Sequence, residues 1–279
     1  MDFPFLRDIF IIFGLSIIIL FICLKIKLPA IAGFLITGIL AGPHCLGLIK
    51  AVHQVEIMSE IGVVLLLFTI GIEFSIKDLL QIRRSVLLGG SVQVVLTTLV
   101  FFIIALKTGQ AVRQSLFIGF LMSLSSTAIV LKLLQERGEI DSPHGRTSVG
   151  VLIFQDIAIV PMILLTPLLA GVGGNLTESI LVLTVKAIGI LLLIIISAKW
   201  LVPQILYQVT RTRNRELFLL SIIIICLAVA WLTHSIGLSF ALGAFLAGLI
   251  VSESEYSHQA LGSILPFRDV FISFFFVSI

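Results

Sequence analysis

The chain has few charged residues and few of the residues on which covalent or metal chemistry depends. Charged side chains make up 12% of its 279 residues, and the formal net charge is only +3. The cysteines fall in or beside apolar runs, without the spacing of a metal site or a disulfide framework: Cys23, Cys45 and Cys226. The sequence contains no phosphate-binding glycine loop, dinucleotide-binding motif or nucleophile motif. We therefore expect no ATPase, no other enzyme, no resident cofactor and no nucleic-acid partner.

Long apolar runs take up most of the chain, which is 59% hydrophobic. A water-soluble domain of this size does not have such a composition, so we expect membrane lipid around it. The spans must be helices, because a barrel would show alternating strands of about ten residues. The sequence predicts an all-α polytopic membrane protein, with residues 1–279 forming one transmembrane domain. Its ten predicted apolar segments are 8–24, 28–43, 56–74, 85–106, 111–134, 147–171, 178–199, 216–233, 237–252 and 266–279.

The first and last segments bear on how the chain is processed. Residues 9–24 end at Lys25 and Lys27 and lack a small-residue cleavage site, so they are predicted to be a span rather than a cleaved signal peptide. The last segment is still apolar at Ile279. We therefore expect the chain to be truncated at its C-terminus.

Basic residues predict the orientation. Most lysines and arginines follow the odd-numbered segments, as in the stretch Arg211–Arg215. The positive-inside rule makes these loops cytoplasmic and puts the N-terminus outside. The 211–215 stretch could also bind anionic lipid head groups, but setting the topology is the simpler explanation.

Two short segments resemble one another. Leu28–Gly38 and Leu238–Gly248 have glycines at the same spacing, and the predicted topology makes them run in opposite directions. Inverted repeats are typical of secondary transporters, whose substrate site lies near the midplane between the halves. On this reading the second repeat is incomplete. The alternative is ordinary packing of small residues between membrane helices.

The most informative residue is Asp156, which lies inside the apolar run 149–171 next to Gln155. An ionised carboxylate at membrane depth costs about 2.5 kcal/mol or more. Burial favours the protonated form of a carboxylate, and a bound cation favours the ionised form, so proton and cation compete for it. Asp156 is therefore predicted to bind a proton, a cation, or each in turn. A structural ion pair with a lysine such as Lys186 is the alternative.

Oxygen atoms near Asp156 suit a monovalent cation. Pro161 lacks an N–H group, which frees the carbonyl of Ile157. The fifth segment contains Ser123 and the run Ser125, Ser126 and Thr127, which predicts a break in the helix with free carbonyls and a dipole end. These hydroxyls could instead bond to the preceding turn and only allow close packing. We predict a site for K⁺ or Na⁺ formed by Asp156, Gln155, Ser125, Ser126 and Thr127.

These residues stand in a longer, colinear pattern. Leu124–Ile129, Leu152–Ala158, Gly237–Gly248 and Ser254–His258, preceded by Gly71–Glu73, resemble the Kef-type potassium/proton antiporters of the monovalent cation:proton antiporter family. The likeness extends over nearly the whole chain. It implies an antiporter fold with two inverted repeats, broken helices that cross at the ion site, and a homodimer.

The resemblance also implies roles for residues. Asp156 would be the carboxylate that binds the ion and the proton, with Gln155 beside it and the break at Ser126 and Thr127 opposite. Glutamine at position 155 resembles the potassium-selective branch, since sodium-type relatives have an acidic or asparagine residue there. Ligand-gated members have an acidic loop before the position of Pro266, but 258–268 contains no acid ahead of it. A cytoplasmic nucleotide-binding regulatory domain would lie beyond Ile279.

These observations favour a K⁺/H⁺ antiporter of the inner membrane that works by alternating access. A Na⁺/H⁺ antiporter is the nearest alternative. A ligand-gated potassium efflux channel would use the same pathway without a counter-ion. In a scaffold or sensor that transports nothing, Asp156 would be part of a structural ion pair.

Overall fold

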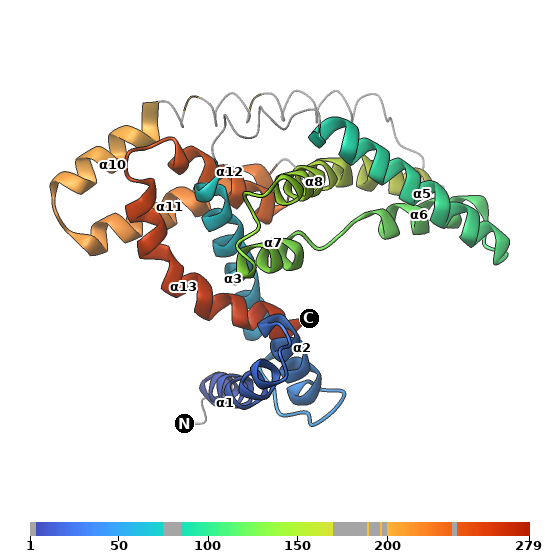
Figure 1. Cartoon of the computed structure of the whole chain (residues 1–279), viewed down its shortest axis with the longest axis horizontal. Helices are drawn as coiled ribbons and strands as arrows, with labels where there is room; N and C mark the ends of the chain where they lie inside the picture. Colours follow the sequence, from blue (N-terminus) through green and yellow to red (C-terminus); the bar gives the residue numbers. More distant parts are fainter. Residues whose placement is uncertain (1–3, 75–84, 170–188, 190–195, 197–199, 236–238) are drawn as a thin grey trace.

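The computed structural model describes residues 4–74, 85–169, 189, 196, 200–235 and 239–279 (Figure 1). Within these residues every regular element is helical and none is a strand. The apolar composition explains this, because helices satisfy their own backbone groups in lipid. The predicted all-α fold is confirmed. Its elements are α1 (Pro4–Lys25), α2 (Ala30–Ala41), α3 (Val52–Glu73), the π-helical turn η1 (Ser85–Gly89), α5 (Gly90–Lys107), α6 (Val112–Ser123), α7 (Thr127–Glu136), α8 (Pro143–Leu169), α10 (Val202–Arg211), α11 (Arg215–His234), α12 (Phe240–Ser252) and α13 (Ser257–Ser278).

The described residues match nine of the ten predicted segments. Seven stretches are long and apolar enough to cross a membrane, and two shorter apolar helices, α2 and α12, are those of the predicted repeat. The segment 178–199 lies outside the described residues. This arrangement makes the chain a multi-pass membrane protein.

Two local predictions were wrong. Residues 202–211 were expected to be part of a loop but form α10, whose residues Val202 and Leu206 are buried. The last helix begins at Ser257 rather than at position 266 and continues through Pro266, so the expected loop at 258–265 is helical. Both errors arise because hydropathy detects long apolar runs but misses helices with only one apolar face.

The core is built around α3. Residues 64–72 of this helix are all buried, which places neighbours on every side of its C-terminal half. The helices packed most closely against it are α12 and α13. Gly71 of α3 faces Gly248 of α12, where a side chain on either glycine would meet the backbone of the other helix. Small residues therefore allow the two backbones to approach closely.

A second group of helices lies beside this core. Figure 1 shows α5 and α6 side by side, with α8 extending from them toward α7 and α3. The helices α5 and α7 are each followed by a glycine with positive φ, Gly109 at 87° and Gly138 at 65°, which ends the helix and turns the chain. Pro143 then begins α8, where its missing N–H costs nothing. The turn at Gly109 brings the fourth predicted segment beside the fifth, and the turn at Gly138 brings the fifth beside the sixth.

Candidate cation site

The predicted break in the fifth segment is present. The helix α6 ends at Ser123 and α7 begins at Thr127, and residues 124–126 between them are not helical. Leu124 and Ser126 have extended backbone conformations, with ψ of 142° and 103°. We call residues 124–126 the break. Such a break leaves backbone groups at the end of α6 and the start of α7 without their usual helical partners.

The hydroxyl groups around the break have three different partners. Ser123 Oγ donates to the carbonyl oxygen of Phe120 at 2.8 Å, which is the return bond expected of simple packing. Ser126 caps α7, since its Oγ accepts from the N–H of Ile129 at 3.4 Å. Thr127 Oγ1 donates to Asp156 Oδ1 at 3.4 Å. Only Ser123 of these three therefore bonds back to its own helix.

Asp156 lies opposite the start of α7. Its side chain is half-buried, and Thr127 is its hydrogen-bond partner among the described residues. No basic side chain forms an ion pair with it in the part of the chain that the structure describes. Lys186, the partner considered in the alternative, is outside the described residues. Ser125 and Ser126 are exposed on the surface of the described residues.

Gln155 forms hydrogen bonds with both the break and α5. Its side chain is buried, at 3% exposure. Its Oε1 accepts from the N–H of Ser125 at 2.9 Å, and its Nε2 donates to Gln93 Oε1 at 2.7 Å. Gln93 Nε2 in turn donates to the carbonyl oxygen of Ser123 at 3.1 Å and to Thr97 Oγ1 at 3.3 Å. Two side-chain amides thus join α5 and α8 to the end of α6 and to the break.

The structure therefore brings Thr127, Asp156, Ser125 and Gln155 together, and Ser126 adjoins them at the start of α7. The helix α8 is continuous through Pro161, so only the fifth segment is interrupted here. Among the described residues there is no cluster of His, Cys, Asp and Glu that could hold a transition metal. One carboxylate with hydroxyl and carbonyl oxygens suits a hard, weakly held cation or a proton.

Sequence reasoning missed Gln93. It lies in the apolar segment 85–106, and its side chain is half-buried. A lone glutamine in an apolar run is a detectable signal, because an unsatisfied amide is costly in lipid. Its partners, however, lie 30 and 62 positions away in the sequence, at Ser123 and Gln155. The bond between Gln93 and Gln155 therefore forms only because the fold places α5 beside α8.

Glu73, the last residue of the matching stretch Gly71–Glu73, is exposed at the end of α3. Its Oε1 accepts from Gln135 Nε2 at 3.2 Å. This contact joins the end of α3 to the last turn of α7.

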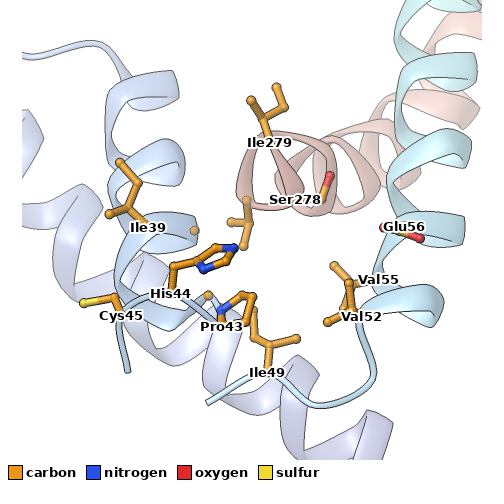
Figure 2. Close-up of a pocket in the computed structure, with 13 residues that line it drawn as sticks. Ile39, Pro43, His44, Cys45, Ile49, Val52, Val55, Glu56, Ser278 and Ile279 are labelled. Atoms are coloured by element: carbon orange, nitrogen blue, oxygen red, sulfur yellow. The ribbon is translucent and has the colours of Figure 1, made fainter. Parts of the chain in front are cut away.

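Two cavities in the described part of the chain do not include Asp156 among their lining residues. A cavity of about 420 Å³ is formed by the end of α2, the loop after it, the start of α3 and the end of α13, with His44 and Glu56 among its lining residues (Figure 2). Another, of about 410 Å³, lies between α6 and α8 and reaches Leu124 and Ile159. Apart from Thr166 its lining is apolar, so Thr166 is the one lining side chain that could offer a cation an oxygen atom.

The sequence of the chain is similar to those of known proteins. The family described as "Sodium/hydrogen exchanger, transmembrane" matches residues 10–279. The chain is 39% identical to "K(+) efflux antiporter 1, chloroplastic" of Arabidopsis thaliana over 94% of its length, and 36% identical to "K(+) efflux antiporter 4" of the same plant over 90%. It is 34% identical to "Glutathione-regulated potassium-efflux system protein KefC" of Klebsiella pneumoniae over its whole length. These relatives are transport proteins.

The relatives are much longer than the chain. It spans 23% of antiporter 1, 43% of antiporter 4 and 45% of KefC. The chain thus corresponds to less than half of each of these proteins.

Proposed function

Because the chain belongs to the sodium/hydrogen exchanger transmembrane family, we propose that it is the transmembrane part of a monovalent cation/proton antiporter. The observation that supports this most strongly is the position of Asp156. A half-buried carboxylate inside a membrane-spanning helix has a hydroxyl partner, Thr127, and no basic partner among the described residues. A carboxylate in that setting can release a proton when a cation arrives and recover it when the cation leaves.

The proposed ion site consists of Asp156 and the oxygen atoms at the break. The hydroxyls of Ser125, Ser126 and Thr127 are the ligands that could replace part of the water shell of the cation. Gln155 belongs to the same site, since its carbonyl oxygen has a second lone pair besides the one that accepts from Ser125. The N-terminal end of α7, which Ser126 caps, carries a partial positive charge that attracts an anion or a carboxylate.

We propose K⁺ as the cation. The support is indirect: the similar proteins are named as K⁺ efflux systems, and position 155 is glutamine rather than an acid. Na⁺ is the alternative, and Asp156 and the hydroxyls alone do not select between the two ions.

Further parts of the proposal concern the whole protein. We propose a location in the inner membrane with the N-terminus outside, two inverted repeats that expose the site alternately, and a homodimer. A cytoplasmic nucleotide-binding domain would follow in the chain, which agrees with the greater length of the relatives.

The test is transport by the natural protein that contains this chain, purified and placed in liposomes with a pH-sensitive dye inside. Adding K⁺ should move protons in the opposite direction, and Asp156→Asn should abolish this movement. Asp141→Asn is the matched control, because Asp141 is an exposed aspartate, 80% accessible, in the loop before α8.

Three outcomes would decide the matter. Exchange that persists in inserted Asp156→Asn protein would remove this residue from the mechanism. Rapid K⁺ flux without proton movement would identify a channel instead. A lower thermal midpoint of Asp156→Asn with no transport by either protein would favour the structural ion pair.

A further inference from the structure

Resting on the proposed function, we propose that Gln93 is a positioning residue of the cation site. It would act through Gln155, with which it holds the break in one geometry. We call these two residues the amide pair. Gln93 contacts neither Asp156 nor the hydroxyls, so its effect on the ion would be indirect.

The contacts of the amide pair support this role. An amide side chain offers one acceptor oxygen and a nitrogen with two donor hydrogens. Gln155 uses its oxygen on the N–H of Ser125, while Gln93 uses its nitrogen on the carbonyl oxygen of Ser123. The two amides then bond to each other at 2.7 Å. A continuous chain of hydrogen bonds therefore runs from the end of α6, at Ser123, to Ser125 inside the break.

The amide pair bonds to two backbone groups that the break leaves without helical partners, the carbonyl oxygen of Ser123 and the N–H of Ser125. In a continuous helix, Ser123 and Ser125 would use their backbone groups within the helix itself. At membrane depth water is scarce, and each unsatisfied group would be expensive. Gln93 and Gln155 replace the missing helical partners. Without these two amides, a continuous helix with its own backbone hydrogen bonds would have the lower free energy. That rearrangement would move the hydroxyls of Ser125 and Ser126.

Through the amide pair, the position of α5 would affect the discrimination between K⁺ and Na⁺. Discrimination between K⁺ and Na⁺ depends on how far apart the oxygen ligands are held. The break holds two of the proposed ligands, Ser125 and Ser126, and Thr127 follows it directly. The helix α5 anchors the end of α6 beside the break through Gln93, which also bonds to Thr97 of its own helix. We therefore expect loss of Gln93 to change the relative affinities for K⁺ and Na⁺, and not only the amount of folded protein.

The experiment is a double-mutant cycle in the full-length protein in liposomes, with KM measured separately for K⁺ and Na⁺. Gln93→Met and Gln155→Met retain most of the side-chain length but lose the amide. Each should raise the KM for K⁺ by roughly tenfold, the loss expected for about 1.4 kcal/mol of binding. The double variant should be about as impaired as Gln155→Met alone, because Gln93 is proposed to act through Gln155. The KM ratio for K⁺ and Na⁺ should move toward one.

Gln54→Leu is the control, since Gln54 is exposed in the first turn of α3 and outside the network. Gln93→Glu provides a second readout in case Gln93→Met folds poorly. It keeps the acceptor for Gln155 and loses the donor to Ser123, so an intermediate change in KM is expected.

Two results would overturn the role of Gln93 without affecting the proposed function. One is a wild-type KM ratio in folded Gln93→Met. The other is a purely additive double variant, which would mean that Gln93 does not act through Gln155. If the wild-type protein shows no cation-dependent proton movement, the proposed function itself fails. The two failures are therefore distinguishable.

Discussion

The side chain of Asp8 binds the backbone of Ala51. Its Oδ2 accepts from the N–H of Ala51 at 2.6 Å and from the N–H of Lys50 at 2.7 Å. Asp8 belongs to α1 and is fully buried, whereas Ala51 is the residue before the first turn of α3. The carboxylate therefore fastens the first helix to the start of the central helix, and its charge is favourable at that helix end.

Replacing Asp8 by Ala should destabilise the protein. The buried N–H of Ala51 would lose its partner, at a cost of about 1–3 kcal/mol, and the part-buried N–H of Lys50 would lose one at a smaller cost. The other carboxylate oxygen, Oδ1, is buried without a partner among the described residues, and its removal offsets part of the loss. We expect a net loss of about 1–3 kcal/mol, seen as a lower thermal midpoint in detergent.

Glu56→Ala is the control for this change. Glu56 lies in α3, and its side chain is 61% accessible and 3.6 Å from His53. An exposed pair of this kind contributes little. A thermal midpoint for Asp8→Ala equal to that of Glu56→Ala would contradict the proposed role of Asp8.

Gly248→Ala should separate α3 from α12. A methyl group there would meet the carbonyl oxygen of Phe68 and the Cα of Gly71, which are backbone atoms that cannot rotate away. Overpacking of this kind costs about 1–3 kcal/mol. Gly262 of α13 is the matched control, because a methyl group there meets nothing within 4 Å. Gly262→Ala should be neutral or stabilising by up to about 1 kcal/mol. Equal thermal midpoints for the two variants would disprove the close contact.

The same contact bears on the predicted inverted repeat. Gly38 and Gly248 occupy matching positions in the two similar segments, and both face the backbone of another helix, Gly38 against Val277 and Gly248 against Phe68. Small-residue packing therefore explains why both glycines are present. The repeat itself stays a prediction.

Polar residues inside apolar runs were the most reliable signal in the sequence. Asp156, Gln155 and the hydroxyls of the fifth segment could be singled out because each is costly at membrane depth. The break followed from the density of serine and threonine. Local chemistry was enough for these features, since it depends on neighbours within one segment.

Features that depend on distant partners could not be predicted. Asp8 stands at the edge of an apolar segment and looks like an interfacial acid, until α1 is packed against the start of α3. The bond between Gln93 and Gln155 requires α5 and α8 to be adjacent. The helix α10 was missed because only one of its faces is apolar. Predicting each of these features would require knowing which helices pack against each other.

Thr127 provides a direct test of the ion site. Its hydroxyl donates to Asp156 at 3.4 Å, a long bond whose net worth falls near the lower end of the usual 0.5–1.5 kcal/mol. Thr127→Val keeps the shape and removes both the donor and a candidate cation ligand. If the proposed antiport is correct, the KM for K⁺ should rise by about two- to fivefold, as the liposome assay would measure.

Thr127→Ser keeps the hydroxyl and should restore most of the wild-type KM. Thr147→Val is the matched control in α8, because the hydroxyl of Thr147 is exposed and bonds only to Pro143 of its own helix. Equal KM values for Thr127→Val and Thr147→Val would show that the hydroxyl of Thr127 does not contribute to cation binding. A raised KM in Thr127→Ser would instead assign the effect to the lost methyl group, and so to the packing of α7 against α8.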